Sequence, residues 1–307
     1  MKDKQAEQKS AFESLMQQKA FQEKAFRELL QYLDQHSPFY QKMFRSGEID
    51  INTVNLTALP TTSKEELQLH NWDFLCVPKS EIAEYTATSG TLGMPVTIAL
   101  TENDLQRLAY NEYCSFAIMG LNETDRIQLL LTLDKQFMAG MAYYQGARKM
   151  GAAVVRTGPG APEMQLEVMR HLGISTLVAV PSFLLKLIET AKALDIDLKT
   201  LPVKKVLAIG ESMYDSEWEK SILHERICKD WPIDIHSTYA ATEMQTAFTA
   251  CNVEAGLHAN PELIIVEFLD DEGNAVAEEE IGEVTITTLG VEGMPLLRYR
   301  TGDLCKH

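Results

Sequence analysis

Residues 176–194 read TLVAVPSFLLKLIETAKAL, and this stretch contains a predicted strand followed at once by a predicted helix. Its first part, Thr176–Val180, is a short apolar run with several β-branched residues, which is typical of a strand. After a proline, apolar residues recur at helical spacing from Ser182 to Leu194. A strand that leads directly into a helix is the repeating unit of an α/β fold.

The same alternation extends over most of the chain, which predicts an α/β fold. Further apolar runs have the length of strands, and the segments between them have the apolar period of helices. The predicted strands are Val96–Leu100, Ile127–Leu131, Ala152–Val155, Lys205–Ile209 and Ile233–His236, and the other predicted helices are Asn103–Met119, Gly140–Met150 and Ala161–Leu172.

The two ends of the chain do not show this alternation of predicted strands and helices. Apolar positions at helical spacing run from about residue 10 to 45, with a break at Ser37-Pro38, and Ser63 with Glu66 forms a capping box that opens a helix Lys64–His70. From about Gly256 onward the pattern predicts antiparallel strands, at Leu263–Phe268, Gly282–Thr287 and Met294–Arg300. We therefore divide the chain into a helical part, 1–84, an α/β part, 85–255, and a β-rich part, 256–307.

The composition indicates a globular protein with a sizeable core. The chain has 307 residues, of which 45% are hydrophobic, and 28 basic against 44 acidic residues give a formal net charge of −16. This charge disfavours a broad surface for nucleic acid or for an anionic membrane.

No segment reaches the roughly 20 apolar residues that span a bilayer. Five scattered cysteines without a CxxC pair favour free thiols, so we expect a cytoplasmic protein. The sequence leaves a homodimer open.

A loop rich in glycine and hydroxyl groups precedes the predicted strand Val96–Leu100. It reads TATSGTLGMP from Thr86 to Pro95. Hydroxyl and backbone N–H donors on such a loop can bind phosphate oxygens, and glycine allows the main chain to approach them closely. The loop lacks the Gly-Lys-Ser/Thr ending of a Walker A motif. A tight hairpin turn is the alternative, because Ser, Thr and Gly are ordinary turn residues.

TSGTLGMP resembles the phosphate loop TSGTTGKP of the adenylate-forming superfamily. The segments SPFYQKMF, LPTTSKEEL and TENDL resemble, in the same order, the phenylacetate-coenzyme A ligases of that superfamily. The resemblance implies the large N-terminal body of such an enzyme, with mixed, layered sheets, flanking helices and a smaller β subdomain, in which 85–255 binds nucleotide and acyl group. It implies phosphate contacts from the loop residues Thr88, Ser89, Gly90, Thr91 and Gly93. The family lysine of the loop is Met94 here, so we expect weaker ATP binding, by about ten- to a hundred-fold.

The segment STYAATE, residues 237–243, follows a predicted strand. A carboxylate just beyond a strand end can hold Mg²⁺, a cation that prefers oxygen ligands; a helix cap at Glu243 and a core tyrosine are the alternatives. STYAATE resembles the family motif YGxTE. The resemblance implies that Tyr239 lies against adenine, that Thr242 contacts the α-phosphate, and that Glu243 binds Mg²⁺; Thr242 and Glu243 are the expected catalytic residues.

The segment LAIGES, residues 207–212, resembles the glycine-glutamate turn that lines the adenine site in this superfamily. That resemblance implies contacts from Gly210, Glu211 and Ser212, while a turn with no ligand is the alternative. Two departures from the YGxTE motif bear on the adenine contacts. The family glycine is Ala240, and the acidic residue that often precedes the tyrosine by two positions is Ser237.

The segment RYRTGD, residues 298–303, is the most specific signal in the sequence. An aspartate on a turn after a strand can accept hydrogen bonds from both ribose hydroxyls. The segment resembles the family motif YRTGD, which implies that Asp303 holds the ribose. In the superfamily the chain continues through a hinge into a small lid domain. We expect either a fragment without that lid or a protein that works without it.

A patch of small and aromatic residues opens the predicted helix 140–150. In the family this region lines the acid, which implies an acyl pocket at Phe137, Gly140 and Tyr143; close helix packing at the small residues is the alternative.

Cys251 and His258 are candidate zinc ligands at irregular spacing. That pattern is weak, because a structural zinc site needs four ligands.

The resemblance implies an AMP-forming acid–thiol ligase that uses ATP, Mg²⁺ and coenzyme A. Such an enzyme activates an aryl or acyl carboxylic acid to acyl-AMP and transfers the acyl group to coenzyme A. Two alternatives stay open. One is an acyl-protein synthetase, whose acceptor is a protein thiol. The other is a nucleotide- or acyl-binding module without catalysis, which Met94 and Ser237 favour.

Overall fold

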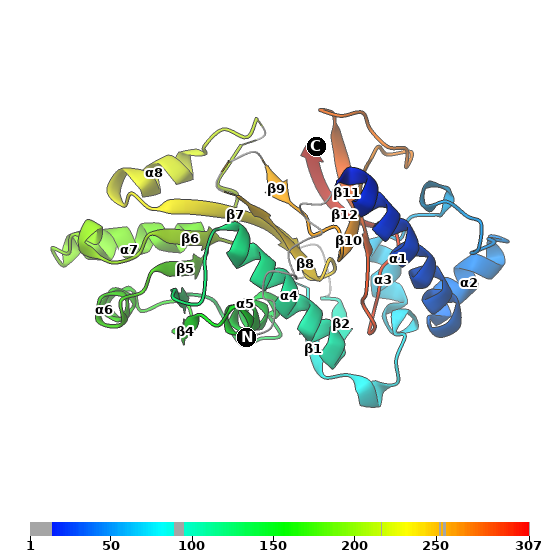
Figure 1. Ribbon diagram of the computed structural model, residues 1–307, viewed down its shortest axis with the longest axis horizontal. Coiled ribbons are helices and arrows are strands. Elements are labelled where there is room, and N and C mark those ends of the chain that lie inside the picture. The colour runs from blue at the N-terminus through cyan, green and yellow to red at the C-terminus, as the bar shows by residue number, and fades with distance from the viewer. Residues whose placement is uncertain (1–13, 89–94, 216, 252, 254–255, 307) are drawn as a thin grey trace. The chain divides into compact units, whose positions relative to one another are not determined.

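The computed structural model describes residues 14–88, 95–215, 217–251, 253 and 256–306. The chain folds into two compact units (Figure 1). Unit 1 contains the described parts of Met1–Arg107, Ala241–Thr246 and Asn260–His307, and unit 2 contains those of Leu108–Ala240 and Ala247–Ala259. This division follows contacts in space. The three ranges predicted along the sequence divide the chain differently and stay a prediction.

Unit 2 is built around a seven-stranded sheet with the order β4-β3-β5-β6-β7-β8-β9. The five strands from β4 to β7 in that order are parallel, and β8 pairs with β9 antiparallel. Parallel strands place their carboxyl ends at one edge, where ligands of open α/β sheets bind. The strands are β3 (Arg126–Leu129), β4 (Ala153–Arg156), β5 (Thr176–Ala179), β6 (Lys205–Ala208), β7 (Asp234–Ala241), β8 (Thr246–Ala250) and β9 (Leu257–His258).

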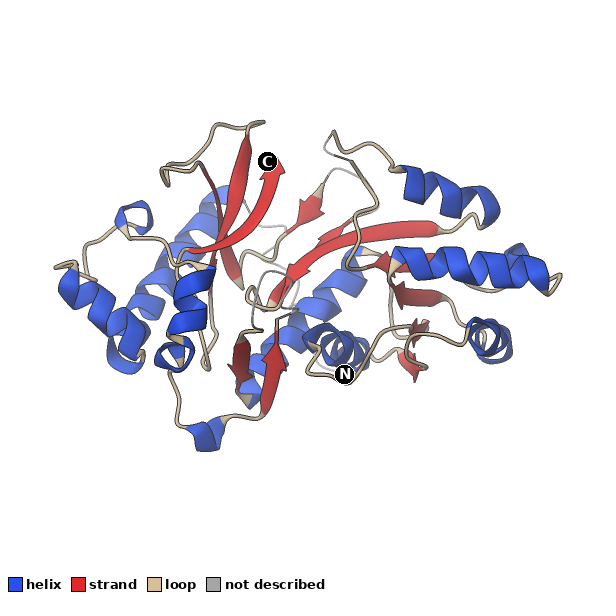
Figure 2. Ribbon diagram, turned by 180° about the vertical axis from the view of Figure 1, so that it is seen from behind, coloured by secondary structure: helices blue, strands red, loops and turns tan. Residues whose placement is uncertain are grey.

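Helices cover both faces of the parallel strands (Figure 2). Along β5, Leu177 and Ala179 pack in one buried cluster while Val178 packs in another, as the two-residue period of a strand requires. The first cluster includes side chains of α6 (Pro162–Leu172), α7 (Pro181–Ala193) and α8 (Ile222–Asp230). The second includes side chains of α4 (Glu102–Ile118) and α5 (Met138–Met150). The sheet therefore lies between two helical layers.

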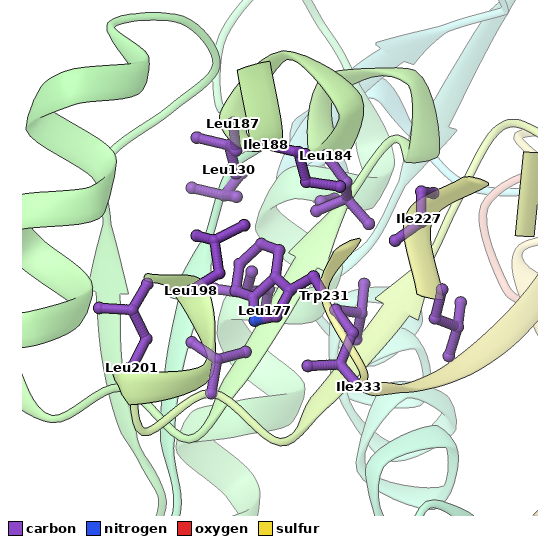
Figure 3. Packing of buried hydrophobic residues seen from close by; sticks show 14 of the residues in the cluster. Leu130, Leu177, Leu184, Leu187, Ile188, Leu198, Leu201, Ile227, Trp231 and Ile233 are labelled. Carbon is purple, nitrogen blue, oxygen red and sulfur yellow. The ribbon is translucent and has the colours of Figure 1, made fainter. Parts of the chain in front are cut away.

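The first cluster is centred on a buried tryptophan. Trp231 is 1% exposed and lies among leucine and isoleucine side chains from the strands, from α7 and from the segment before β6 (Figure 3). Burying a large apolar side chain contributes roughly 1.5–3 kcal/mol. Leu201 comes just before β6, and Trp231 and Ile233 come just before β7, so this part of the core packs at the amino ends of these strands.

Unit 1 combines N-terminal helices with two antiparallel sheets. Its sheets are the hairpin β1-β2 and the three-stranded sheet β10-β11-β12. The helices are α1 (Leu15–His36), α2 (Pro38–Ser46) and α3 (Lys64–Leu69), and the strands are β1 (Glu84–Ala87), β2 (Thr97–Leu100), β10 (Ile264–Leu269), β11 (Ile281–Thr288) and β12 (Tyr299–Lys306).

The helix boundaries of unit 1 follow the capping residues of the sequence. Ser37 ends α1 and its hydroxyl accepts the N–H of Tyr40, so that α2 starts with Pro38. At α3, the hydroxyl of Ser63 accepts the N–H of Glu66, and the Glu66 carboxylate accepts the N–H of Ser63. The predicted capping box is confirmed.

Most predicted elements are confirmed, with ends shifted by one or two residues. Two strands differ. The strand predicted at Ile233–His236 extends to Ala241. The prediction of a strand at Met294–Arg300 is wrong for most of its length, since β12 begins at Tyr299. The main-chain N–H groups just before it bond to side chains: Leu296 donates its N–H to Thr288 Oγ1, and Leu297 donates its N–H to the Tyr40 hydroxyl. The main chain of this segment also bonds to β11, because Thr288 donates its N–H to Leu296 O. We did not predict β1, α8, β8 or β9.

The α/β fold with a smaller β subdomain, predicted from the sequence, is confirmed. Among the helices in the part of the chain that the structure describes, none combines the length and the apolar character of a membrane span.

Candidate nucleotide and acyl site

Glu243 lies in the turn between β7 and β8, and its side chain is buried in unit 1. The residue is 6% exposed, and its Oε1 lies 3.5 Å from Nζ of Lys64. The hydroxyl of Tyr299 donates to the same oxygen at 3.3 Å. Burial raises the pKa of Tyr299, and the charge of Glu243 raises it further. Tyr299 therefore keeps its proton and remains a donor to the carboxylate.

Main-chain pairing brings the partners of Glu243 together from distant parts of the sequence. Thr62 forms a parallel bridge with Tyr299, in which Thr62 donates its N–H to Arg298 O and Arg300 donates its N–H to Thr62 O. The Thr62 hydroxyl donates to Leu297 O at 2.8 Å. Because the capping box at Ser63 starts α3 directly after this bridge, Lys64 lies at the first helical position beside β12.

Arg298, the residue before β12, ties this strand to the segment that precedes Thr62. Its guanidinium is 3% exposed and forms two hydrogen bonds with the carboxylate of Glu267 on β10, at 3.0 and 2.9 Å. The same side chain donates to the carbonyl oxygens of Thr57 and Leu59. A buried charge is tolerated when it is paired in this way. Arg298 therefore fixes the start of β12, where Tyr299 lies.

Asp303 lies within β12, and not on a turn after a strand as predicted. A bulge separates the pairs Thr285↔Arg300 and Glu283↔Leu304, so that Thr301, Gly302 and Asp303 lie opposite Val284 alone. Gly302 has φ of +82° and donates its N–H to Glu283 Oε1 at 2.9 Å. Bulges change the direction of a side chain. The Asp303 carboxylate is exposed to solvent at this bulge.

The glycine and hydroxyl loop begins where β1 ends. Thr88 is buried, its N–H donates to Val96 O at 3.0 Å, and its hydroxyl accepts the N–H of Val96 at 3.0 Å. These two bonds close the base of the loop. The predicted phosphate contacts of Ser89, Gly90, Thr91 and Gly93, and the departure at Met94, lie outside the described residues.

The predicted adenine turn follows β6 at the carboxyl edge of the sheet. Gly210 has φ of +76°, a conformation that favours glycine. The Glu211 carboxylate accepts the N–H of Ser182 at 2.8 Å, near the N-terminus of α7, and the Ser212 hydroxyl donates to Tyr214 O at 2.6 Å. Both side chains thus stabilise the turn itself. Their contacts with adenine stay a prediction.

Tyr239 lies on β7, the strand next to β6. Its ring is half-buried, with its centroid 5.7 Å from that of Phe248 in an edge contact. The neighbouring Thr238 donates its hydroxyl to Ala208 O at 3.1 Å, at the end of β6. The turn Gly210–Ser212 and Tyr239 are thus on adjacent strands at one edge of unit 2. Thr242 is half-buried in the turn that follows β7.

The predicted acyl residues lie at and just before the N-terminal half of α5. A Cβ at Gly140 would lie 2.1 Å from Thr132 O, so this glycine is required for close packing against the segment after β3. Tyr143 is buried, with its side chain hydrogen-bonded to Thr238. Phe137 precedes the helix and is 39% exposed. The structure thus links Tyr143 to β7 and gives Gly140 a packing role.

The candidate zinc ligands lie on the β8–β9 edge. His258 is on β9, opposite Thr249, and Cys251 directly follows β8. Among the described residues, no group of three or more His, Cys, Asp and Glu side chains has the arrangement of a metal site.

The model of the AMP-binding enzyme family matches residues 44–293 of this chain. The chain belongs to the AMP-binding enzyme family. The match covers most of unit 1 and all of the parallel sheet, so the fold and the family agree.

Relatives of this AMP-binding family member include two named phenylacetate-coenzyme A ligases. That of Thermus thermophilus is 26% identical over 295 residues, which cover 93% of this chain and 65% of the relative. That of Escherichia coli K12 is 26% identical over 298 residues, with 94% of this chain and 66% of the relative covered. The chain thus spans slightly less than two thirds of the length of these relatives.

Solved structures of AMP-binding enzymes share the fold. An open conformation of 2-hydroxyisobutyryl-CoA ligase, in complex with 2-HIB-AMP and CoA, has a TM-score of 0.86 at 19% identity, with 96% of this chain and 71% of that chain covered. O-succinylbenzoate coenzyme A synthetase from Bacillus subtilis, in complex with ATP and magnesium ion, has a TM-score of 0.56 at 19% identity, with 72% and 46% covered.

Sequence reasoning missed Lys64 and Tyr299 as neighbours of Glu243. Lys64 was predicted only as the start of a short helix, and Tyr299 only as part of the motif around Asp303. The available signal was that both lie in segments that resemble the family. Their meeting at Glu243 depends on the bridge between Thr62 and Tyr299, which joins residues far apart in the sequence.

Proposed function

We propose that this protein uses ATP to activate a carboxylic acid as acyl-AMP, with release of pyrophosphate, and that the acyl group then passes to coenzyme A. The acid is of the aryl or acyl type, as the names of the relatives suggest. Membership of the AMP-binding enzyme family supports the nucleotide part of this proposal. The relatives named phenylacetate-coenzyme A ligase support the acid and the acceptor.

The observation that carries the proposal is the buried carboxylate of Glu243 between Lys64 and Tyr299. The carboxylate of Glu243 would exchange the lysine ammonium for Mg²⁺ that is bound to the nucleotide phosphates, and the released ammonium would bind a phosphate oxygen. Asp303 lies four residues after Tyr299 on the same strand, and its exposed carboxylate can accept two ribose hydroxyls. One strand thus connects the proposed phosphate and ribose contacts.

The residues present fit Mg²⁺. Magnesium usually keeps several waters and binds through one or two carboxylates together with substrate phosphates. Glu243 offers one carboxylate, and no cage of three or more acidic or other ligating residues occurs among the described residues. We propose Glu243 as the protein ligand. When bound, Mg²⁺ neutralises phosphate charge.

The other residues position the substrates. We propose that Tyr239 and the turn Gly210–Ser212 contact adenine, that Thr242 and the loop that begins at Thr88 contact phosphates, and that Tyr143 and Phe137 line the acyl group. Activation of this kind depends on positioning and on stabilising charge, so it requires no activated side-chain nucleophile. All five cysteines are free thiols, which supports a reducing, cytoplasmic setting for the activity.

ATP–pyrophosphate exchange with a panel of aryl and fatty acids tests the proposed function. It should be run on this chain and on the longest natural form of the protein. We expect exchange that depends on the acid, and formation of an acyl-CoA when coenzyme A is added. Nucleotide binding without exchange for any acid in either form would contradict the proposal and favour a binding module. Acylation of a protein thiol in place of coenzyme A would correct the acceptor.

A further inference from the structure

Glu112 is a buried acidic residue on α4 to which the proposed reaction assigns no role. It is 3% exposed and lies where α4 contacts α5 at Gly146. A Cβ at Gly146 of α5 would lie only 2.4 Å from Cβ of Glu112. Glycine at this position therefore allows the two helices to approach so closely that the carboxyl of Glu112 is enclosed.

The carboxyl of Glu112 is only partly satisfied by the protein. Asn111 donates its side-chain amide to Oε1 at 3.1 Å, and the Ser115 side chain is a second hydrogen-bonding neighbour. Oε2 is buried and has no hydrogen-bond partner among the described residues. Burial raises the pKa of this carboxyl to about 7. Buried polar atoms in native proteins are nearly always hydrogen-bonded, so an oxygen left over in this way indicates a ligand or another unassigned partner.

Glu112 is coupled to the proposed acyl site through Tyr143. The ring of Phe116, one turn after Glu112 on α4, lies 6.0 Å from the ring of Tyr143, and after burial the charge of Glu112 is the largest cause that raises the pKa of the Tyr143 hydroxyl. The Tyr143 side chain is hydrogen-bonded to Thr238, and Thr238 donates to Ala208 O. A chain of buried and half-buried polar groups thus leads from α4, past α5, to Thr238 on β7, which is next to Tyr239, and to the end of β6, just before Gly210.

A purely structural role explains less of this arrangement. A buried acid that only stabilises a fold has its oxygens paired, as Glu267 does with the guanidinium of Arg298. Glu112 has no cation beside it among the interactions that raise or lower its pKa. A leucine of similar size would avoid the cost of burying an unpaired oxygen.

We propose that Glu112 is a specificity residue of the acyl site, where its unpaired oxygen accepts a hydrogen bond from a hydroxyl or amino group on the acyl part of the substrate. This inference rests on the proposed function and narrows its acid to one that carries a donor away from the reacting carboxylate. A site built to bond such a group discriminates strongly against the acid that lacks it.

The test is an equilibrium titration with acyl-sulfamoyladenosines, which are stable analogues of an acyl-AMP. The probes are the phenylacetyl analogue and its hydroxyl- and amino-substituted forms at each ring position. We expect the parent chain to bind at least one substituted form about ten- to a hundred-fold more tightly than the unsubstituted one. Glu112→Leu should abolish this ratio, and Glu112→Gln, which keeps an acceptor oxygen, should retain part of it. Glu123→Gln, at an exposed acid just after α4, is the matched control.

Binding of AMP, measured on each variant, checks that the fold is kept. An equal ratio in the parent and in Glu112→Leu, or no preference in the parent for any substituted form, overturns the inference and leaves the proposed function standing. Failure of the parent chain to bind AMP and every analogue overturns the proposed function, and the inference with it.

Discussion

Lys64 and Glu243 form a nearly buried ion pair, and we expect binding of ATP with its metal to separate the two side chains. Their side chains are 22% and 8% exposed, so water screens them less than an exposed pair. If ATP brings its metal to Glu243, the ammonium of Lys64 is released toward the phosphates. Lys64 would then supply a positive charge to the phosphates, which the sequence of the proposed phosphate loop lacks because it has Met94 in place of the family lysine.

Lys64→Met is therefore expected to weaken binding of ATP with Mg²⁺ by about ten-fold, because a hydrogen bond to a charged group is lost. AMP, with fewer phosphates, should be affected less. Calorimetric titration of both nucleotides measures this. Lys42→Met makes the same charge change at an exposed position of α2 and should bind like the parent. Equal weakening by the two variants would show that Lys64 has no specific contact with phosphate.

Glu112 makes the folded protein sensitive to pH. Its pKa is raised by burial from 4.5 to about 7, so the folded chain holds a proton that the unfolded chain releases between these values. The contribution of this group to the free energy of unfolding is present below pH 4.5 and is lost as pH rises through 7, by about 3 kcal/mol. Urea unfolding of the parent and of Glu112→Gln, at pH 5 and pH 8, measures this. The free energy of unfolding of the parent, relative to that of Glu112→Gln, should be lower at pH 8 than at pH 5. No change in this difference would show that the carboxyl is solvated.

Gly140 at the start of α5 is a packing glycine. Alanine normally stabilises a helix relative to glycine by up to about 1 kcal/mol, but here its Cβ would lie 2.1 Å from the carbonyl oxygen of Thr132. We expect Gly140→Ala to lower the midpoint of thermal unfolding, because backbone must move to accommodate it. Glu167→Ala, at an exposed position of α6, should change the midpoint little. An unchanged or higher unfolding midpoint for Gly140→Ala would show that there is room for a side chain at this position, which favours the acyl-pocket interpretation.

Gly302 gives β12 the bulge that carries Asp303. Space for a Cβ is open at this position, but φ of +82° costs a residue with a side chain roughly 1–2 kcal/mol. Gly302→Ala should therefore weaken AMP binding by shifting the bulge, while the protein still folds. Comparison of AMP affinity with the midpoint of unfolding separates the two effects. Unchanged affinity would show that the bulge does not position Asp303 for the ribose.

The strands and helices of the parallel sheet could be predicted because local patterns determine them. The run Thr176–Ala179 and the helix after it occur where apolar period and proline place them. The start of β12 could not be predicted, since Met294–Leu297 is as apolar as a strand. The amide of Leu296 bonds to the side chain of Thr288, and the amide of Leu297 bonds to the hydroxyl of Tyr40, which lies 257 residues away in the sequence. Patterns along the chain do not reveal partners of that kind.

The motifs of the candidate site could be predicted from the sequence, but the arrangement of their side chains in space could not. Glu243 and Asp303 were selected by resemblance, and their roles stay predictions that the fold supports. The neighbours of Glu243 depend on the bridge between Thr62 and Tyr299. Glu112 gave no signal, because one acidic residue in an amphipathic helix is usually exposed. Only the packing of α4 on α5 at Gly146 shows that it is buried.

At the scale of the whole molecule, two compact units carry different parts of the proposed machinery. Unit 1 holds Lys64, Glu243 and Asp303, while unit 2 holds Tyr239, Tyr143 and Glu112. Each unit can therefore be tested by itself. Substitutions in unit 1 should change the phosphate and ribose contacts proposed there, and substitutions in unit 2 should change the adenine and acyl contacts proposed for that unit.

The most direct test of the nucleotide site is equilibrium titration of AMP, and of ATP with and without Mg²⁺, on the parent chain, Glu243→Gln and Asp303→Ala. We predict that Glu243→Gln loses the part of ATP affinity that depends on Mg²⁺ and retains AMP binding, because it keeps the shape but not the charge of the metal ligand. Asp303→Ala should weaken AMP and ATP alike, since both contain the ribose. If both variants bind all three forms as the parent does, the proposed site is wrong.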